Sequence, residues 1–244
     1  MQGLSRFARA VRHWVWLMPV VVGVAFVIGG GYMILEGRNA HDEVRDNIVR
    51  EDITVAEDAP AFGGETVDSA GKADAQAEAI LEHTLTATGG YLYAAIGRFV
   101  LPEGNYILPN GTYMTPDGGT TQDPEAAATD ANGNPVIVTT DEALAARNAN
   151  DEPIPGWTSD RELAATDADG NPIANSLRDT AQISAFLRTS LGVAVMGFRV
   201  SDLVVGLGAF LLFLGLMNVI IISPVTYWGV VVADEHERSR TKGA

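Results

Sequence analysis

The sequence predicts an α-helical membrane protein with two transmembrane helices, a helical extracytoplasmic juxtamembrane core, and a small insertion that is either β-hairpin or disordered. Two apolar runs, residues 15–35 and 203–222, carry this prediction because neither contains a charged side chain. A helix rises about 1.5 Å per residue, so about 20 apolar residues match the hydrocarbon core of a bilayer. The chain between the two runs is polar, acidic and rich in turn residues.

Basic residues flank both apolar runs on the side of the chain termini. They are Arg6, Arg9, Arg12, Arg238, Arg240 and Lys242. Because basic residues next to a span favour the cytoplasmic side, we expect a multi-pass protein of the plasma membrane with both termini cytoplasmic. A cleaved signal peptide is the alternative for the first run, although its apolar stretch is longer than the usual 7–15 residues.

Composition and charge exclude several functions. The chain has no cysteine, which excludes disulfides, thiol catalysis and iron–sulfur or zinc-ribbon sites. Residues 36–198 hold 27 acidic and nine basic side chains, a net charge of −18. A field of this sign repels nucleic acid, so we expect no nucleic-acid partner; the lipid bilayer is the expected surrounding of the apolar runs.

The polar parts of the chain divide by composition. Residues 73–88 are rich in alanine and predict a helix that Gly89 and Gly90 end. Ser176 and Asp179 have the spacing of a capping box, and no proline follows until Pro224, so a helix can run from there through the second span. The expected segments besides the two spans are a basic amphipathic tail (1–14), an extracytoplasmic segment (36–97), an acidic insertion (98–175), a juxtamembrane helix (176–202) and a cytoplasmic tail (223–244).

The insertion contains a repeat. Residues 129–136 and 166–173 match at six of eight positions, and both contain a glycine after Asn or Asp; residues 108–118 share this turn chemistry. Such turns between strand formers predict small hairpins. Oxygen-bearing residues at alternate positions also resemble calcium loops, but proline stands where an EF-hand needs glycine.

No catalytic or cofactor-binding constellation is evident. Of the four histidines, His13 and His236 are expected on the cytoplasmic side, so only His41 and His83 could meet outside, and their spacing gives no support for a ligand pair. The chain lacks the nucleophile-elbow and phosphate-loop motifs. We therefore expect a protein that is not an enzyme and that holds no cofactor or metal.

Small residues in the two runs predict close helix–helix contacts. These candidates are Gly23, Gly29, Gly206, Gly208, Gly215 and Asn218, whose amide would bond across the contact. Arg199 and Asp202, three residues apart, are expected to form a local pair at the outer headgroups.

Two stretches carry a family pattern. The first comprises Ala73, Ala75, Gln76, Ala77, Ile80, His83, Leu85, Thr88, Gly89, Gly90 and Tyr93; the second comprises Arg178, Ala185, Phe186, Leu187, Arg188, Ser190 and Leu191. Together they resemble a family of small two-span membrane proteins of actinobacteria, mostly of unknown function, some of which carry an aromatic ring-opening dioxygenase label. The resemblance implies a shared packing or interaction site formed by His83, Thr88, Gly89, Gly90 and Arg188.

The expected function is that of a structural or accessory protein that assembles with itself or with another membrane protein. The alternative is an extracytoplasmic module that binds or senses a cation or small ligand.

Overall fold

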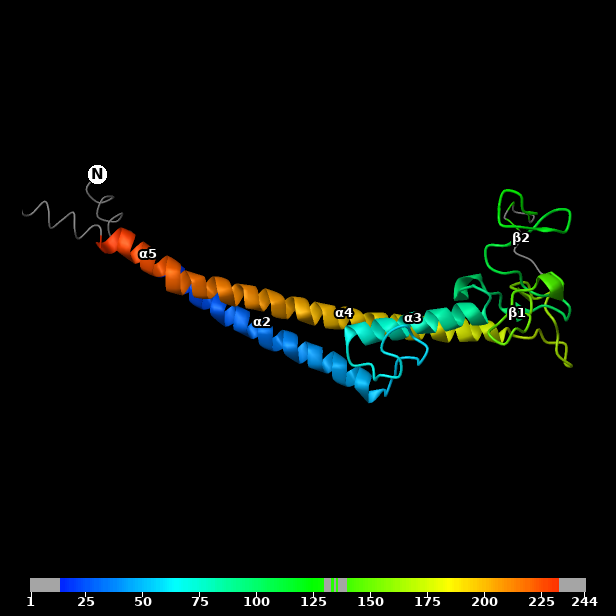
Figure 1. Cartoon of the computed structure of the whole chain (residues 1–244), viewed down its shortest axis with the longest axis horizontal. Helices are drawn as coiled ribbons and strands as arrows, with labels where there is room; N and C mark the ends of the chain where they lie inside the picture. The colour runs from blue at the N-terminus through cyan, green and yellow to red at the C-terminus, as the bar shows by residue number, and fades with distance from the viewer. Residues whose placement is uncertain (1–13, 130–132, 134, 136–139, 233–244) are drawn as a thin grey trace, which may run out of the picture. The chain divides into compact units, whose positions relative to one another are not determined.

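A computed structural model describes residues 14–129, 133, 135 and 140–232, and they are mostly helical. The chain forms two compact units (Figure 1). Unit 1 comprises residues 1–51 and 196–244, and unit 2 comprises residues 52–195. The predicted orientation in the membrane depends on basic residues in the two terminal tails. These residues lie outside the described part of the chain.

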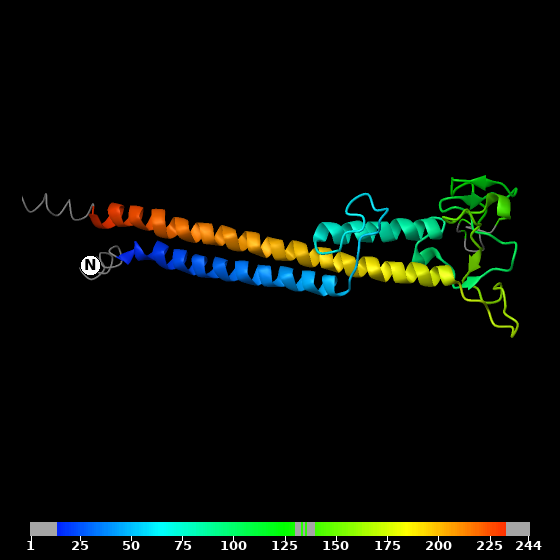
Figure 2. The same ribbon diagram turned by 60° about the horizontal axis from the view of Figure 1, so that its bottom comes forward.

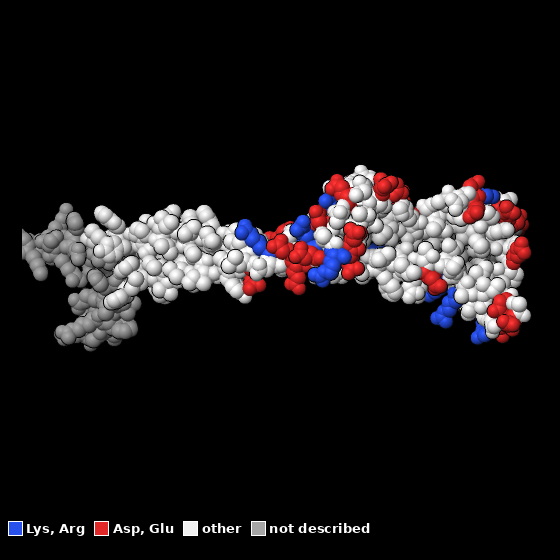
Figure 3. All heavy atoms as spheres, turned by 90° about the horizontal axis from the view of Figure 1, so that it is seen from below, with Lys and Arg blue, Asp and Glu red and all other residues white. Residues whose placement is uncertain are grey.

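Unit 1 is a pair of antiparallel helices, α2 (Leu17–Arg50) and the second part of α4 (Ser176–Met217). Both helices are long and apolar enough to cross a membrane, and only 11% of the apolar stretch of each is buried within the structure. On the face in Figure 3, the apolar end of unit 1 carries no Lys, Arg, Asp or Glu. A core helix of a soluble protein would be mostly buried, so these helices differ from that class.

The helices extend beyond the segments predicted for the spans. α2 continues from Leu35 to Arg50, because no proline interrupts residues 36–50 and its Gly37 packs against α4. α4 passes residue 202 without a break and continues through η3 (Asn218–Ile222), α5 (Ser223–Tyr227) and η4 (Trp228–Val232). The π-helical turn η3 directly precedes Pro224, which cannot donate a backbone hydrogen bond to the preceding turn.

Unit 2 is built on α3 (Ala70–Ala87), which lies alongside the first half of α4 in both ribbon views (Figures 1 and 2). A loop before α3 folds back on itself, with a bridge between Thr54 and Thr66. The Gln76 side chain accepts a hydrogen bond from the backbone N–H of Ala56, which joins this loop to α3. The hydrophobic core of the unit is formed by Tyr91, Ile96, Ile107, Ala146, Ile154 and Ala181.

The described part of the insertion forms short paired strands. β1 (Phe99–Val100) pairs antiparallel with β4 (Trp157–Thr158), and β2 (Tyr113–Met114) pairs antiparallel with β3 (Thr120–Thr121). The short helix η1 (Tyr93–Ala95) precedes the insertion, and η2 (Glu142–Leu144) lies within it. Of the two alternatives, hairpin or disorder, the described residues follow the first. Residues 136–140, the strand formers that follow the first copy of the repeat, fall almost wholly outside them.

Candidate functional site

The segment from Thr88 to Gly90 joins α3 to the insertion. Gly89 and Gly90 have positive φ angles of 65° and 91°, and the Gly90 N–H donates to the Leu85 carbonyl at 2.7 Å, as in a Schellman helix end. The buried Thr88 hydroxyl lies 2.8 Å from the Thr84 carbonyl and 2.5 Å from the Tyr91 carbonyl. Asn110 donates to both glycine carbonyls, through its N–H and its side-chain amide. These hydrogen bonds therefore hold the end of α3 in place, and we call Thr88, Gly89, Gly90 and Asn110 the junction.

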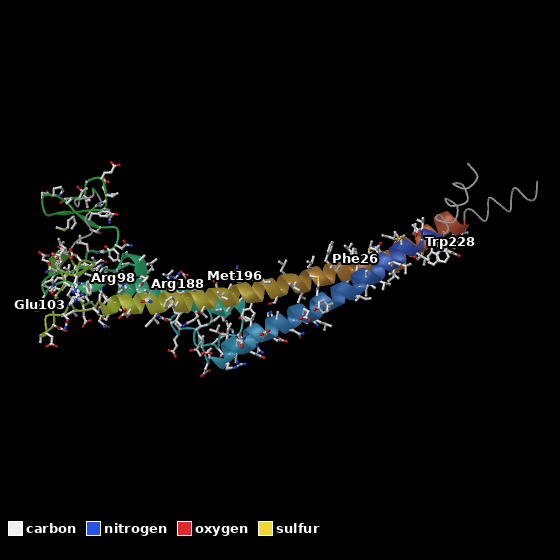
Figure 4. All side chains as sticks on the ribbon, turned by 180° about the vertical axis from the view of Figure 1, so that it is seen from behind. Phe26, Arg98, Glu103, Arg188, Met196 and Trp228 are labelled. Carbon is white, nitrogen blue, oxygen red and sulfur yellow. The ribbon has the colours of Figure 1, made fainter. Side chains whose placement is uncertain are left out.

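His83 and Arg188 do not join this junction. His83 Nε2 lies 2.7 Å from the Asp58 carboxylate, a hydrogen bond that lowers the pKa of Asp58. Arg188 is on α4 (Figure 4) and forms no hydrogen bond or ion pair with any described residue. His83 lies on an exposed face of α3 and Arg188 on α4, and the joint packing of all five residues stays a prediction.

Arg178, rather than Arg188, holds the start of α4 in unit 2. Its guanidinium lies 4.2 Å from the centre of the Tyr93 ring and donates to the carbonyls of Tyr93 and Ile96. The helix cap is Asn175, whose side chain accepts from the Leu177 N–H and donates to the Gly97 carbonyl. The sequence prediction placed this cap at Ser176; an Asn one residue earlier is an equally good N-cap signal.

The contact between α2 and α4 in unit 1 is made by small residues at intervals of seven. A Cβ added to Gly30 would lie 2.5 Å from the Gly208 carbonyl oxygen, and one added to Gly23 would lie 2.8 Å from that of Gly215. A heptad spacing keeps the same face of each helix on the seam. The facing pairs are Gly23 with Gly215, Gly30 with Gly208, and Gly37 with Ser201.

Three of the residues predicted for this contact are placed differently. Gly29 and Gly206 have open space where a Cβ would stand, because each is one or two positions, about 100° or 200°, away from the facing side. The Asn218 amide donates to the Leu214 carbonyl of its own helix at 2.9 Å, not across the contact. The seven-residue spacing of Gly23, Gly30 and Gly37 was the signal that the sequence prediction missed.

Polar side chains of α2 and α4 meet next to the glycine contact, at His41 and Asp202, and we call this pair the polar level. His41 Nδ1 lies 3.3 Å from Asp202 Oδ1, and the His41 ring packs edge-on against the Phe198 ring with 5.0 Å between their centres. Asp202 therefore pairs with α2, whereas the sequence predicted a local pair with Arg199. Since His83 pairs with Asp58, the two histidines that were the only candidates for a shared site each have a different carboxylate partner.

The repeated turns of the insertion have one shared geometry. Backbone bridges join Thr129 to Pro135 and Thr166 to Pro172, and Gly133 and Gly170 have positive φ angles of 80° and 81°. The Asp167 carboxylate accepts hydrogen bonds from the N–H groups of residues 169 and 171, which lowers its pKa. Both hydrogen bonds are accepted by Oδ1 of Asp167, so the carboxylate is part of the turn itself. The matching residues 130–132 and 134 lie outside the described residues.

A third copy of this turn was not recognised in the sequence. Arg147 and Pro153 form the same bridge, and Asn148 accepts from the N–H groups of residues 150 and 152. Asp151 takes the place of the glycine, with a φ of 62°. The sequence signal was an Asn-Ala-Asn-Asp stretch ending in proline, in which Asn replaces Asp and Asp replaces Gly.

A shallow depression of about 430 Å³ lies beside the His83–Asp58 pair. Its polar lining includes the side chains of Glu82, Asn148 and Asn150. Among the described residues, no three His, Cys, Asp or Glu side chains are grouped so that they could hold a metal ion.

Taken together, the fold and these contacts define a helical hairpin with two candidate membrane spans and a separate unit of helices and tight turns. No protein-family model, curated protein or solved structure matches the chain.

Proposed function

We propose that this chain is a two-span protein of the plasma membrane, with both termini cytoplasmic and unit 2 outside, and that it acts by assembly with itself or another membrane protein rather than by catalysis. The charge-free, largely unburied stretches of α2 and α4 support the two spans. The polar level at His41 and Asp202, next to Glu36 on α2, supports an outer boundary there.

The glycine contact supports retention of the first span. Backbone approach this close needs glycine on both helices, and it would be lost if the N-terminal run were cleaved as a signal peptide. A cleaved chain would leave Gly208 and Gly215 without the helix that they fit.

The observation that carries assembly is an uncovered apolar strip on the α4 part of unit 2. Ile183, Phe186 and Val193 are 59%, 63% and 65% exposed, whereas Ala181 and Leu191 on another face of the same helix are buried. These residues precede the polar level of Asp202 in the helix, so lipid does not account for them. Exposed contiguous apolar surface of this kind is typical of protein interfaces.

Blue-native electrophoresis of the full chain after mild detergent extraction tests the proposal. We expect a complex larger than the monomer, and a lone monomer under all extraction conditions would contradict it.

Because the chain lacks cysteine, a single Glu103→Cys variant tests the topology: we expect an impermeant thiol reagent to label it in intact cells. Protection of that cysteine until the cells are opened would contradict the orientation.

A second candidate function is weak binding of a cation or cationic small ligand outside the membrane. The depression lined by Asp58 and Glu82 favours a cationic small ligand, because carboxylates attract positive charge, whereas the described residues offer no group of three side chains for a metal ion. Calorimetric titration of the full chain in detergent with calcium, and separately with a small diamine, tests it. The absence of heat at millimolar ligand would remove this candidate.

A further inference from the structure

We propose that the apolar strip on α4 is covered by a second copy of this chain, through parallel pairing of α4 with the α4 of that copy. The inference rests on the proposed function and names its partner and interface. From Val193 to Phe210, large exposed side chains recur on α4 in alternating steps of three and four, the a and d positions of a heptad, and Phe186 lies one heptad before Val193. Position a holds Phe186, Val193, Val200 and Leu207, and position d holds Met196, Leu203 and Phe210; we call these seven residues the outer seam.

The outer seam lies on a different side of α4 from the seam that α2 occupies. Ser201, Gly208 and Gly215, which face α2, are buried. Leu203 and Phe210 stand two positions after Ser201 and Gly208, about 200° around the helix, and Val200 and Leu207 stand one position before them, about 100° in the other direction. The seven outer-seam side chains are between 47% and 70% exposed. One helix thus carries two heptad seams, of which α2 covers one.

Lipid does not explain the outer seam along its whole length. Phe186, Val193, Met196 and Val200 come before the polar level of Asp202 in α4, whereas α2 beyond that level is rich in charged side chains. A lipid-facing surface also needs no period of 3.5 residues, yet the alternation keeps its phase over the 18 residues from Val193 to Phe210, about 26 Å of helix.

Several features favour a second copy as the occupant. Copies inserted with one topology have parallel α4 helices, so identical residues meet at one level, and a seam without charge is complementary to itself. Valine at a with leucine or methionine at d favours two strands. Gly192 and Gly206, at g positions beside the seam, have open space above the backbone and permit close approach. Seven side chains, each about half exposed or more, supply several hundred Å² per protomer, on the order of the roughly 800 Å² of a standard interface.

Single-cysteine variants of the full chain in native membranes test the inference, because the chain has no cysteine of its own. Val200→Cys places a thiol on the outer seam, and Asp202→Cys is the matched control: two residues away, also exposed, but about 130° from the centre of the seam. Under mild oxidation we expect Val193→Cys, Val200→Cys and Leu207→Cys to give a disulfide-linked dimer several-fold more efficiently than Asp202→Cys. Each variant is also compared with the parent chain by its elution in detergent, so that misfolding is detected.

The outcomes separate the inference from the proposed function. Equal crosslinking of Asp202→Cys and Val200→Cys would indicate random collision and overturn the inference. Absence of crosslinking at all three seam positions, together with a native complex that contains a different protein, would overturn the second copy as partner and leave the proposed function standing. Absence of crosslinking with a lone monomer on the native gel would overturn both.

Discussion

Gly30 of α2 and Gly208 of α4 face each other so closely that neither has room for a side chain. A Cβ added to Gly30 would lie 2.5 Å from the Gly208 carbonyl oxygen, and one added to Gly208 would lie 2.7 Å from that of Gly30. Gly29, one residue earlier, has open space at the same point. A methyl group would therefore clash with α4 at Gly30 but would have room at Gly29.

We predict opposite effects for Gly30→Ala and Gly29→Ala. The first forces two backbones apart and should cost about 1–3 kcal/mol of stability, whereas the second should be neutral or stabilising by up to about 1 kcal/mol, because alanine is the better helix former. Thermal unfolding of the full chain in detergent measures both. Equal melting temperatures for the two variants would show that the helices do not meet at Gly30.

Thr88→Val is predicted to destabilise unit 2 by about 1–3 kcal/mol, because it removes a buried hydroxyl and leaves the Tyr91 carbonyl without that donor. Thr86→Val is the matched control, since Thr86 is exposed on the same helix and the substitution has the same shape. Thermal unfolding of the two full-length variants gives the comparison. A melting temperature for Thr88→Val equal to that of Thr86→Val would contradict the role of the junction.

The three turns predict which residues are tolerated at Gly170. Asp151 occupies the equivalent position of the third turn with a φ of 62°, close to the 81° of Gly170. Asp and Asn adopt this left-handed region more readily than Ala, for which it costs about 1–2 kcal/mol. Gly170→Asp should therefore reduce the melting temperature less than Gly170→Ala does. The reverse order would mean that the turns are not equivalent.

Tyr91→Phe is predicted to leave stability at neutral pH unchanged or to raise it. The Tyr91 hydroxyl is buried without a hydrogen-bond partner among the described residues, and burial raises its pKa to about 12. Removal of the hydroxyl therefore breaks no described bond. Equilibrium unfolding at pH 7 measures the effect, and a clear loss of stability would show that the hydroxyl has a partner.

The same pKa predicts how stability depends on alkaline pH. Because the pKa in the folded chain is above the ordinary value of 10, the contribution of Tyr91 to stability is complete below pH 10 and is lost as the pH rises toward 12. Tyr91→Phe should lack that part of the decline. Identical alkaline unfolding profiles for the parent chain and the variant would contradict this assignment.

The long helices follow from local sequence, but their contacts do not. A charge-free length of apolar residues is enough to predict the apolar parts of α2 and α4, and the absence of proline before Pro224 is enough to predict that α4 is continuous. Which glycine faces the partner helix depends on the rotation of both helices. The sequence prediction therefore included Gly29 and missed Gly30 and Gly37, although their spacing of seven from Gly23 was visible.

The candidate site shows the same division between local and long-range information. Turn chemistry predicts the end of α3 at Gly89 and Gly90 and the hairpin character of the insertion. The pairing of Phe99 with Thr158 joins residues far apart in sequence, and no local pattern predicts it. For the same reason the sequence prediction included Arg188 in the site and not Arg178: both are arginines on one helix, and packing against Tyr93 distinguishes Arg178.

The heptad spacing of the glycines has a consequence for alignment. Since Gly23, Gly30 and Gly37 repeat at the interval of Ser201, Gly208 and Gly215, sliding one helix by seven residues would again bring small residues face to face. Such a slip moves a helix by about 10 Å and would carry either Glu36 or Asp202 into the charge-free stretch of its neighbour, where a carboxylate is costly. The glycines thus determine how closely the helices approach, and the carboxylates at the polar end determine which of several sterically equivalent alignments is adopted.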